Sequence, residues 1–219
     1  MKKYKKILQK CPLFRDIREE DLFRMLECLR ARVTSFDKKY TILAEGNPAK
    51  YIGVVLSGSV QMIRVDWYGN RSILAESGEG EVFGEAFACS ETEELPVTVV
   101  ACEPCDILLI DSRHILHTCE KHCTFHQQLI FNLMKDLAAK TLQFHQKLEV
   151  VSGRTTRERL MTYLTMQAKK AGSRSFTIPF DRQELADFLE VDRSGLSAEI
   201  GRLRREGVLE SEKNRFVLL

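Results

Sequence analysis

Four cysteine and histidine side chains near the middle of the chain offer metal-binding or thiol chemistry. Cys119, His122, Cys123 and His126 are spaced so that they fall on one stripe of a helix. Two ligands at i and i+4 can share a metal ion, but four in a row extend about 10 Å along a helix, too far for one ion. A site would need ligands from elsewhere or from a second copy. We favour packing of the helix start against its own domain, and expect no metal or cofactor.

The other cysteines give weaker signals. Cys102 and Cys105 have ligand-like spacing, but no second Cys-x-x-Cys exists, and residues three apart on a strand point to opposite faces. We interpret them as small buried residues. Seven cysteines at no disulfide-framework spacing favour a reducing compartment. A thiol-based sensor stays open as an alternative, because thiol reactivity depends on exposure and pKa.

Basic and polar side chains gather in residues 182–205, where the pattern predicts two short helices joined by a tight turn. Asp181 and Glu184 form a capping box for the first helix. Val191 can fill the corner, and Asp192 can cap the second helix. The apolar faces of the two helices are formed by Leu185, Phe188 and Leu189, and by Leu196, Ile200 and Leu203. This is a helix-turn-helix arrangement.

The polar face of the second helix is suited to the major groove of DNA, where its first turns can contact base edges. The side chains expected to contact DNA are Arg193, Ser194, Ser197, Arg182, Gln183 and Arg204. An ordinary helical hairpin with a solvated face is the alternative. We favour DNA binding, because capping, spacing and basic content agree.

Composition fits a soluble globular protein, with 44% hydrophobic and 29% charged residues in 219. The formal net charge is only +2, so attraction to nucleic acid must come from a local patch. Residues 152–219 contain 13 Lys and Arg against 10 Asp and Glu, a mild basic excess. No apolar run reaches transmembrane length, and residues 1–10 lack the apolar core of a signal peptide, so we expect a cytoplasmic protein without membrane contact.

The elements that must position these residues predict an α+β fold. Residues 4–30 form a helical lead-in, and short β-branched runs with Gly turns between about Val33 and Ile110 indicate an antiparallel β-roll of the double-stranded β-helix or jelly-roll-like kind. A long helix follows from about Ser112 to Val151. Ser152-Gly153 breaks the helical pattern and is the expected hinge and domain boundary. The next helix can be capped by Thr155 and Glu158. Together with a short strand, the helix-turn-helix and two closing strands, this helix predicts a winged helix-turn-helix. The expected domains are 1–111, 112–151 and 152–219.

The long helix carries two apolar stripes, one able to pack on the β-domain and the other on a second copy of the chain. About 40 helical residues span about 60 Å, longer than a small domain needs to bury, which favours a dimer. A single helix buried in its own domain is the alternative. The first stripe, which we predict as the dimer seam, is Ile130, Leu133, Leu137, Phe144 and Leu148. The second stripe is Phe131, Met134, Ala138 and Leu142.

In this order, the elements resemble the Crp/Fnr family of bacterial transcription regulators. The resemblance covers nearly the whole chain and lies in Tyr51-Ile-x-x-x-Leu-Ser-Gly58, Gly80-Glu-Val-Phe-Gly-Glu85 and the Arg182-Gln-Glu-Leu-Ala stretch. It implies a homodimer on a palindromic operator, with half-sites about 34 Å apart. It further implies that effector binding in the roll sets the geometry of the recognition helices, and that RNA polymerase is a partner if the protein is an activator.

The chain departs from the cyclic-nucleotide-binding members at the phosphate site. In those members a Gly-Glu pair is followed about ten residues later by Arg-Ser, which hold the phosphate. Here Gly84-Glu85 is present, but Leu95-Pro96 aligns with the closing pair. Leucine cannot neutralise a phosphate, and proline has no N–H to donate. We therefore predict an unidentified, apolar or anionic small-molecule effector rather than cyclic AMP. The expected pocket residues are Gly84, Glu85, Ala86, Leu95, Pro96 and Val97.

A second departure lies in the recognition helix, where the positions that read bases in many members are Ser194, Ser197 and Ala198. Arg193 is retained, and can contact a guanine edge or a phosphate. We therefore expect the docking mode to be shared, but not the operator sequence.

Taken together, these features predict an effector-gated, homodimeric, sequence-specific DNA-binding transcription regulator. The alternatives are a thiol-, redox- or metal-responsive regulator of the same fold, and a sensor module that acts by protein contact with weak DNA binding. An enzyme is not expected, because no nucleophile elbow, P-loop, zinc-protease helix or dinucleotide fingerprint is present.

Overall fold

The structure, a computed structural model, describes all residues except 1, 91–92 and 117–123. The chain divides into two compact units, which we describe separately. The β-roll unit comprises residues 1–64 and 74–141, and the winged-helix unit comprises residues 142–219 together with 65–73. No helix among the described residues is both long and apolar enough to cross a membrane.

The β-roll unit begins with short helices that supply one side of its core. They are η1 (Lys2–Tyr4), α1 (Lys5–Lys10), η2 (Pro12–Phe14) and α2 (Glu19–Cys28). Three acidic residues open α2, where they favour the helix N-terminus, and its side chains Leu22, Met25 and Leu26 are buried. They share one hydrophobic cluster with residues of the strands that follow.

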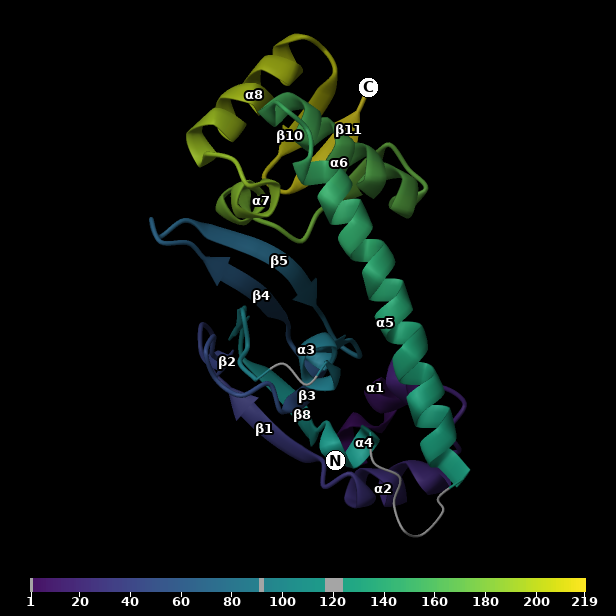
Figure 1. Cartoon of the computed structure of the whole chain (residues 1–219). Coiled ribbons are helices and arrows are strands. Elements are labelled where there is room, and N and C mark those ends of the chain that lie inside the picture. The colour runs from purple at the N-terminus through teal and green to yellow at the C-terminus, as the bar shows by residue number, and fades with distance from the viewer. Residues whose placement is uncertain (1, 91–92, 117–123) are drawn as a thin grey trace. The chain divides into compact units, whose positions relative to one another are not determined.

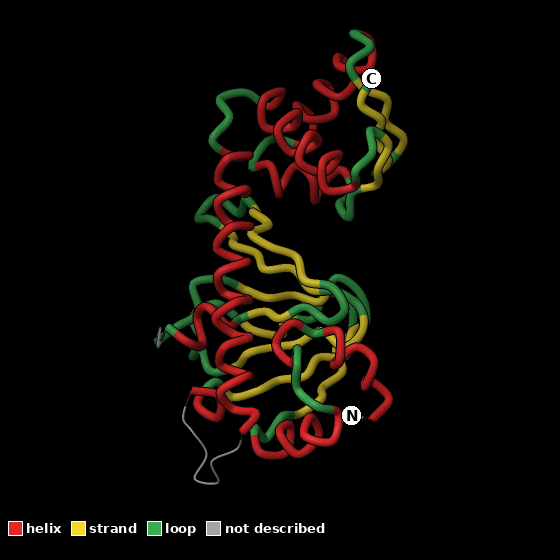
Figure 2. Tube along the Cα trace, turned by 90° about the vertical axis from the view of Figure 1, so that its right-hand side faces the viewer, coloured by secondary structure: helices red, strands yellow, loops and turns green. Residues whose placement is uncertain are grey.

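Two four-stranded sheets form the roll (Figures 1 and 2). The first has the order β1 (Arg32–Phe36), β8 (Cys105–Asp111), β3 (Tyr51–Ser57) and β6 (Val82–Phe83). The second has the order β2 (Thr41–Leu43), β7 (Thr98–Ala101), β4 (Val60–Val65) and β5 (Arg71–Ser77). The pairs β1–β8, β3–β8, β3–β6, β2–β7 and β4–β7 are antiparallel. The predicted antiparallel sheet domain is thus confirmed, and β1 and β6 are strands that the sequence patterns did not single out.

The predicted continuous helix from Ser112 to Val151 is wrong in its first part. The structure has two separate helices, α4 (Arg113–Leu116) and α5 (Thr124–Val151). A ring nitrogen of His126 lies 2.7 Å from the carbonyl oxygen of Ile115. In one continuous helix, eleven residues would separate these positions by about 16 Å. The long helix is therefore α5, which at 28 residues has a length of about 42 Å.

The winged-helix unit continues from the end of α5. It contains α6 (Thr156–Ala171), β9 (Ser175–Thr177), α7 (Arg182–Leu189), α8 (Arg193–Arg205), β10 (Leu209–Glu212) and β11 (Arg215–Leu218). The predicted cap of α6 is present, since the Thr155 hydroxyl accepts a hydrogen bond from the Glu158 N–H at 3.1 Å. The strands form a three-stranded antiparallel sheet in the order β10, β11, β9, which is the wing.

Candidate DNA-binding and effector sites

Helix α7 is held at its start by the capping box predicted from the sequence. An Asp181 carboxylate oxygen accepts a hydrogen bond from the Glu184 N–H, and the Glu184 carboxylate accepts one from the Asp181 N–H, both at 2.9 Å. The helix ends at Glu190, whose φ of 54° lies in the left-handed region. This residue turns the chain toward α8, as a tight helix-turn-helix corner requires.

Helix α8 presents its polar face to solvent, because its apolar face is used by the core. Leu196, Ile200 and Leu203 are buried, whereas Arg193 and Ser197 are exposed. Asp192 caps the helix by accepting hydrogen bonds from the Ser194 hydroxyl at 2.5 Å and the Gly195 N–H at 2.7 Å. These two hydrogen bonds, the Ser194 bond first, lower the pKa of Asp192. The Ser194 hydroxyl is therefore part of the cap.

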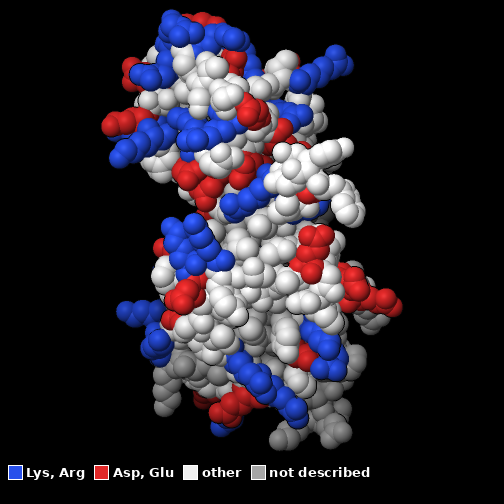
Figure 3. Space-filling model, turned by 90° about the vertical axis from the view of Figure 1, so that its left-hand side faces the viewer, with Lys and Arg blue, Asp and Glu red and all other residues white. Residues whose placement is uncertain are grey.

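Three arginines of α8 provide positive charge that is free for a ligand. Within the described residues, the side chains of Arg193, Arg204 and Arg205 are exposed and make no hydrogen bond or ion pair with the chain. By contrast, Arg202 is paired with Glu199 at 2.8 Å. Figure 3 shows Lys and Arg side chains gathered over the part of the molecule that holds α8. This local basic surface matches the expectation from a chain with little net charge.

Two residues predicted to contact DNA also make contacts inside the chain. Arg182 is half-buried, donates a hydrogen bond to the Lys213 carbonyl at 3.3 Å and lies 5.8 Å from the centre of the Phe216 ring. Gln183 donates to the Asp187 carboxylate at 2.8 Å. Arg182 therefore joins α7 to the wing, a role that spacing along the sequence does not indicate.

The C-terminal end of α7 is held by cations from α5 and α6. Lys147 of α5 donates a hydrogen bond to the Phe188 carbonyl, and its Nζ lies 3.7 Å from the centre of the Phe188 ring. Arg159 of α6 donates to the carbonyls of Leu189 at 3.1 Å and Glu190 at 2.8 Å. Carbonyls at a helix end lack helical partners and carry partial negative charge, which favours these cations. The predicted hinge is fixed by the same group, since Arg159 also donates to the Gly153 carbonyl at 2.8 Å.

The predicted effector turn lies between β6 and the short helix α3 (Glu85–Cys89). Gly84 has a φ of 78°, and a Cβ there would lie 2.9 Å from the Tyr51 carbonyl oxygen, so glycine is required. Glu85 is buried, whereas Ala86 is exposed. The turn thus directs the Glu85 carboxylate into the β-roll unit.

The closing segment of the expected pocket is tied to the turn between β2 and β3. The Leu95 N–H donates to the Asn47 carbonyl at 2.8 Å, and the Leu95 carbonyl accepts from the Gly46 N–H at 2.9 Å. Leu95 and Val97 are buried, whereas Pro96 is exposed. The Leu95 N–H therefore has a protein partner already, and Pro96 has no N–H to offer an anion.

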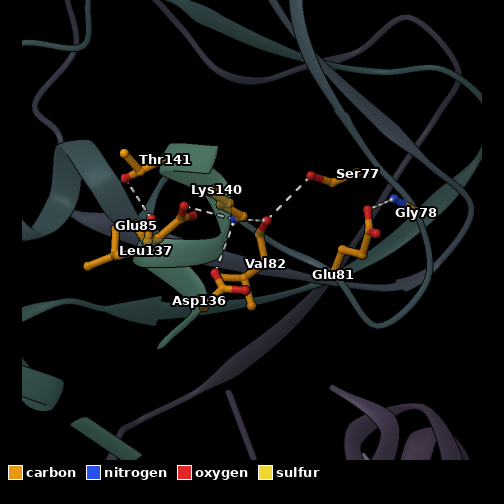
Figure 4. Close-up of polar contacts among 9 residues, drawn as sticks. All are labelled: Ser77, Gly78, Glu81, Val82, Glu85, Asp136, Leu137, Lys140 and Thr141. Carbon is orange, nitrogen blue, oxygen red and sulfur yellow. Dashed lines mark hydrogen bonds and ion pairs between the residues drawn. The ribbon is translucent and has the colours of Figure 1, made fainter. Parts of the chain in front are cut away.

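The sequence patterns missed Lys140, which is bonded to Glu85. Lys140 Nζ lies 2.8 Å from Glu85 Oε1, 2.6 Å from the Val82 carbonyl oxygen and 3.3 Å from Asp136 Oδ2 (Figure 4). Asp136 and Lys140 are spaced i, i+4 on α5, a pattern that was visible in the sequence. Their partner Glu85, however, lies 55 residues earlier, and no local pattern indicates that pairing.

The structure separates the two apolar stripes of α5, and it corrects the predicted seam. Leu133 is buried in the cluster that forms the core of the β-roll unit, and Leu137 packs against that cluster. Ile130 is partly buried, while Phe144 and Leu148 are 45% and 63% exposed. On the second stripe, Phe131, Met134 and Leu142 are 46%, 56% and 64% exposed. Leu133 and Leu137 thus face their own domain, whereas the second stripe is exposed.

Reactive thiol chemistry is disfavoured at three of the cysteines that the structure describes. Burial raises the pKa of Cys11 to about 12, and it also raises the pKa of Cys89 and Cys105, which disfavours reactive thiolates there. Cys119, His122 and Cys123 of the predicted ligand stripe lie outside the described residues. Their fourth member, His126, is buried with its ring nitrogen on the Ile115 carbonyl. No group of potential metal ligands occurs among the described residues.

Two family models match the chain, one for each kind of domain. A family described as "Cyclic nucleotide-binding domain" matches residues 33–122, and one described as "Crp-like helix-turn-helix domain" matches residues 158–219. The chain is 22% identical over 205 residues to the global nitrogen regulator of Synechocystis sp., covering 90% of this chain and 89% of that protein. It is 23% identical over 187 residues to the transcriptional activator protein FnrA of Stutzerimonas stutzeri, covering 83% and 74%.

Solved structures show the same fold. CLP, a c-di-GMP responsive global regulator of Xanthomonas campestris, superposes with a TM-score of 0.74 at 19% identity, covering 90% of this chain and 98% of that one. FixK2 of Bradyrhizobium japonicum gives 0.66 at 23% identity, covering 86% and 92%. The Crp-like helix-turn-helix match and the regulators to which the chain is similar define a transcription regulator rather than an enzyme. The chain belongs to the Crp/Fnr family of these regulators.

Proposed function

We propose that this regulator binds a palindromic DNA operator as a homodimer and is gated by a small-molecule effector other than cyclic AMP. The observation that carries DNA binding is the exposed N-terminal face of α8, where Arg193 and Ser197 are free on a capped helix with a buried apolar face. A helix of this kind docks in the major groove with its first turns against base edges. Two copies then contact half-sites about 34 Å apart. If the protein activates transcription, RNA polymerase is a further partner.

The seam that supports dimerisation is the exposed stripe of α5, namely Phe131, Met134, Ala138 and Leu142, continued by Leu148. Exposed apolar side chains at this spacing match a two-helix seam.

Operator binding is tested by a gel shift of the purified protein against genomic fragments at two or more salt concentrations. We expect retention of particular fragments and an affinity that falls with salt, because arginines displace counterions from phosphates. Equal, weak retention of every fragment would exclude sequence-specific binding and favour a module that acts by protein contact.

The exclusion of cyclic AMP rests on both ends of the expected pocket. Leu95-Pro96 supplies neither a cation nor a free N–H, and the Glu85 carboxylate is bonded to Lys140. Titration calorimetry with cyclic AMP should therefore show no micromolar binding. A dissociation constant in the micromolar range or below would contradict this part of the proposal.

A further inference from the structure

Lys140 joins three parts of the β-roll unit at one point (Figure 4). Its ammonium group contacts the Val82 carbonyl on β6, the Glu85 carboxylate at the start of α3 and the Asp136 carboxylate on its own helix. The Lys140, Glu85 and Asp136 side chains are only 22%, 5% and 10% exposed. Ion pairs shielded from water in this way break only at considerable cost, so the turn and α5 are firmly tied together.

The side chains of Lys140, Glu85 and Asp136 have more hydrogen-bond acceptors than donors. One ammonium group faces two carboxylates, and Glu85 Oε2 is buried without a hydrogen-bond partner among the described residues. Burial raises the pKa of Asp136, and the Glu85 charge raises it further, while Lys140 opposes the shift. A buried acceptor without a partner is costly and favours any ligand that can donate to it.

The turn that carries Glu85 has little freedom to adjust alone. Gly84 is held in the left-handed region against the Tyr51 carbonyl, and the Val82 carbonyl just before it also accepts from Lys140. A ligand that draws Glu85 away therefore has to weaken a bond to α5. The excess of carboxylate oxygens favours a hydroxyl or ammonium donor at this position over an anionic group.

We propose that Lys140 is a positioning residue that couples the Gly84–Glu85 turn to helix α5, so that a ligand donating a hydrogen bond to Glu85 acts on α5 through Lys140. This inference rests on the proposed function, because it places the effector at that turn. It adds Lys140 as the residue that transmits the signal.

The test uses full-length protein and the variants Glu85→Gln, Lys140→Met and the double substitution. Lys38→Met is the control, because it removes an exposed lysine of the same unit that lies far along the chain from the turn and from α5. The first readout is amide hydrogen exchange of the free protein, followed by mass spectrometry. We expect faster exchange in residues 82–89 and also in residues 136–146 for both single variants, with strands β3 and β8 unchanged. Faster exchange in residues 82–89 alone would overturn the proposal.

The second readout is affinity for a retained operator fragment, measured where every variant is folded. Coupling between sites commonly amounts to about 5- to 150-fold in affinity. We expect Glu85→Gln and Lys140→Met to change operator affinity at least about fivefold in the same direction, with no further change in the double variant. Unchanged affinity, opposite directions or additive effects would overturn the proposal.

The experiment separates failure of the proposal from unfolding of a variant and from failure of the proposed function. Lys140→Met leaves Glu85 buried without its cation and risks unfolding, but Glu85→Gln leaves Lys140 paired with Asp136 and carries the test by itself. If wild-type protein binds no operator, the proposed function fails, while hydrogen exchange still decides whether α5 responds to the turn.

Discussion

At the scale of single residues, we take as candidates for DNA contact the exposed side chains that make no hydrogen bond within the chain. Ser194 caps α8, Arg182 is bonded to the wing and Gln183 to Asp187. Arg193 makes no such bond within the described residues and lies in the first turn of α8. It is therefore the best candidate for contact with a base edge or a phosphate.

Replacing Arg193 with alanine distinguishes these two contacts. If Arg193 donates two hydrogen bonds to a guanine edge, Arg193→Ala should cost about 1–3 kcal/mol of operator binding and flatten the preference at one base pair. The measurement is a gel shift or anisotropy titration against an operator and its single-base variants. Arg24→Ala, which removes an exposed arginine from α2, is the control. Equal weakening on every sequence, with a smaller salt dependence, would identify a phosphate contact instead.

At the scale of elements, helix α7 is fixed at its C-terminal end by contacts with α5 and α6. Lys147 and Arg159 donate to its last carbonyls, so the helix-turn-helix is joined to the end of the long helix by charge-assisted hydrogen bonds. Burial lowers the pKa of Lys147 to about 8; the nearby Arg159 charge lowers it as well, while Glu190 raises it. The hydrogen bond from Lys147 to α7 is therefore sensitive to pH near 8, where most lysines stay protonated.

The pH dependence of stability has a definite sign. Between pH 8 and about 10.5, the unfolded chain holds the Lys147 proton that the folded protein has released. Stability from this residue therefore rises with pH across that window, and the cost of burying its charge is fully present below pH 8. The substitution Lys147→Met removes the titrating group and with it this pH-dependent contribution to the free energy of unfolding. The free energy of unfolding of Lys147→Met minus that of wild type should therefore fall as the pH rises from 7 to 10.

Denaturant titrations at each pH measure that difference. Lys169→Met, which removes an exposed lysine from α6, should instead follow the wild-type curve in parallel. A Lys147→Met curve that also runs parallel to wild type would show that Lys147 titrates as an ordinary surface lysine.

At the scale of the whole molecule, a dimer would place two α8 helices on one operator through the exposed stripe of α5. Met134 is 56% exposed near the middle of that stripe, so a charge there would be buried in the proposed seam. Met134→Glu should raise the dimer dissociation constant by tenfold or more in sedimentation equilibrium, because burying an unpaired charge is costly.

Gln143→Glu is the control for this seam. Nine helical residues separate positions 134 and 143, which places them on opposite sides of α5, and Gln143 is also exposed. The control should remain as dimeric as wild type. A Met134→Glu protein with unchanged association would rule out this stripe as the seam.

The features that the sequence determined by itself depend on residues close together along the chain. Asp181 with Glu184, and Thr155 with Glu158, are three residues apart, and both predicted caps are present because helix ends are stabilised by their nearest neighbours. The β-branched runs bounded by glycine turns likewise predicted most strands, and with them the α+β class. Strand β6 has only two residues and depends on pairing with β3, so no run marked it.

Tertiary structure decided everything that depends on distant partners. The two stripes of α5 have equivalent spacing, and only packing on the β-roll core shows that Leu133 faces inward and Met134 outward. Lys140 meets Glu85 across 55 residues, and Lys147 meets Phe188 across 41. The Gly84–Glu85 pair was visible in the sequence as a ligand motif, but the fold has bonded its carboxylate to α5. The periodicity of a sequence indicates which face of a helix or strand is apolar. What that face packs against depends on the tertiary structure.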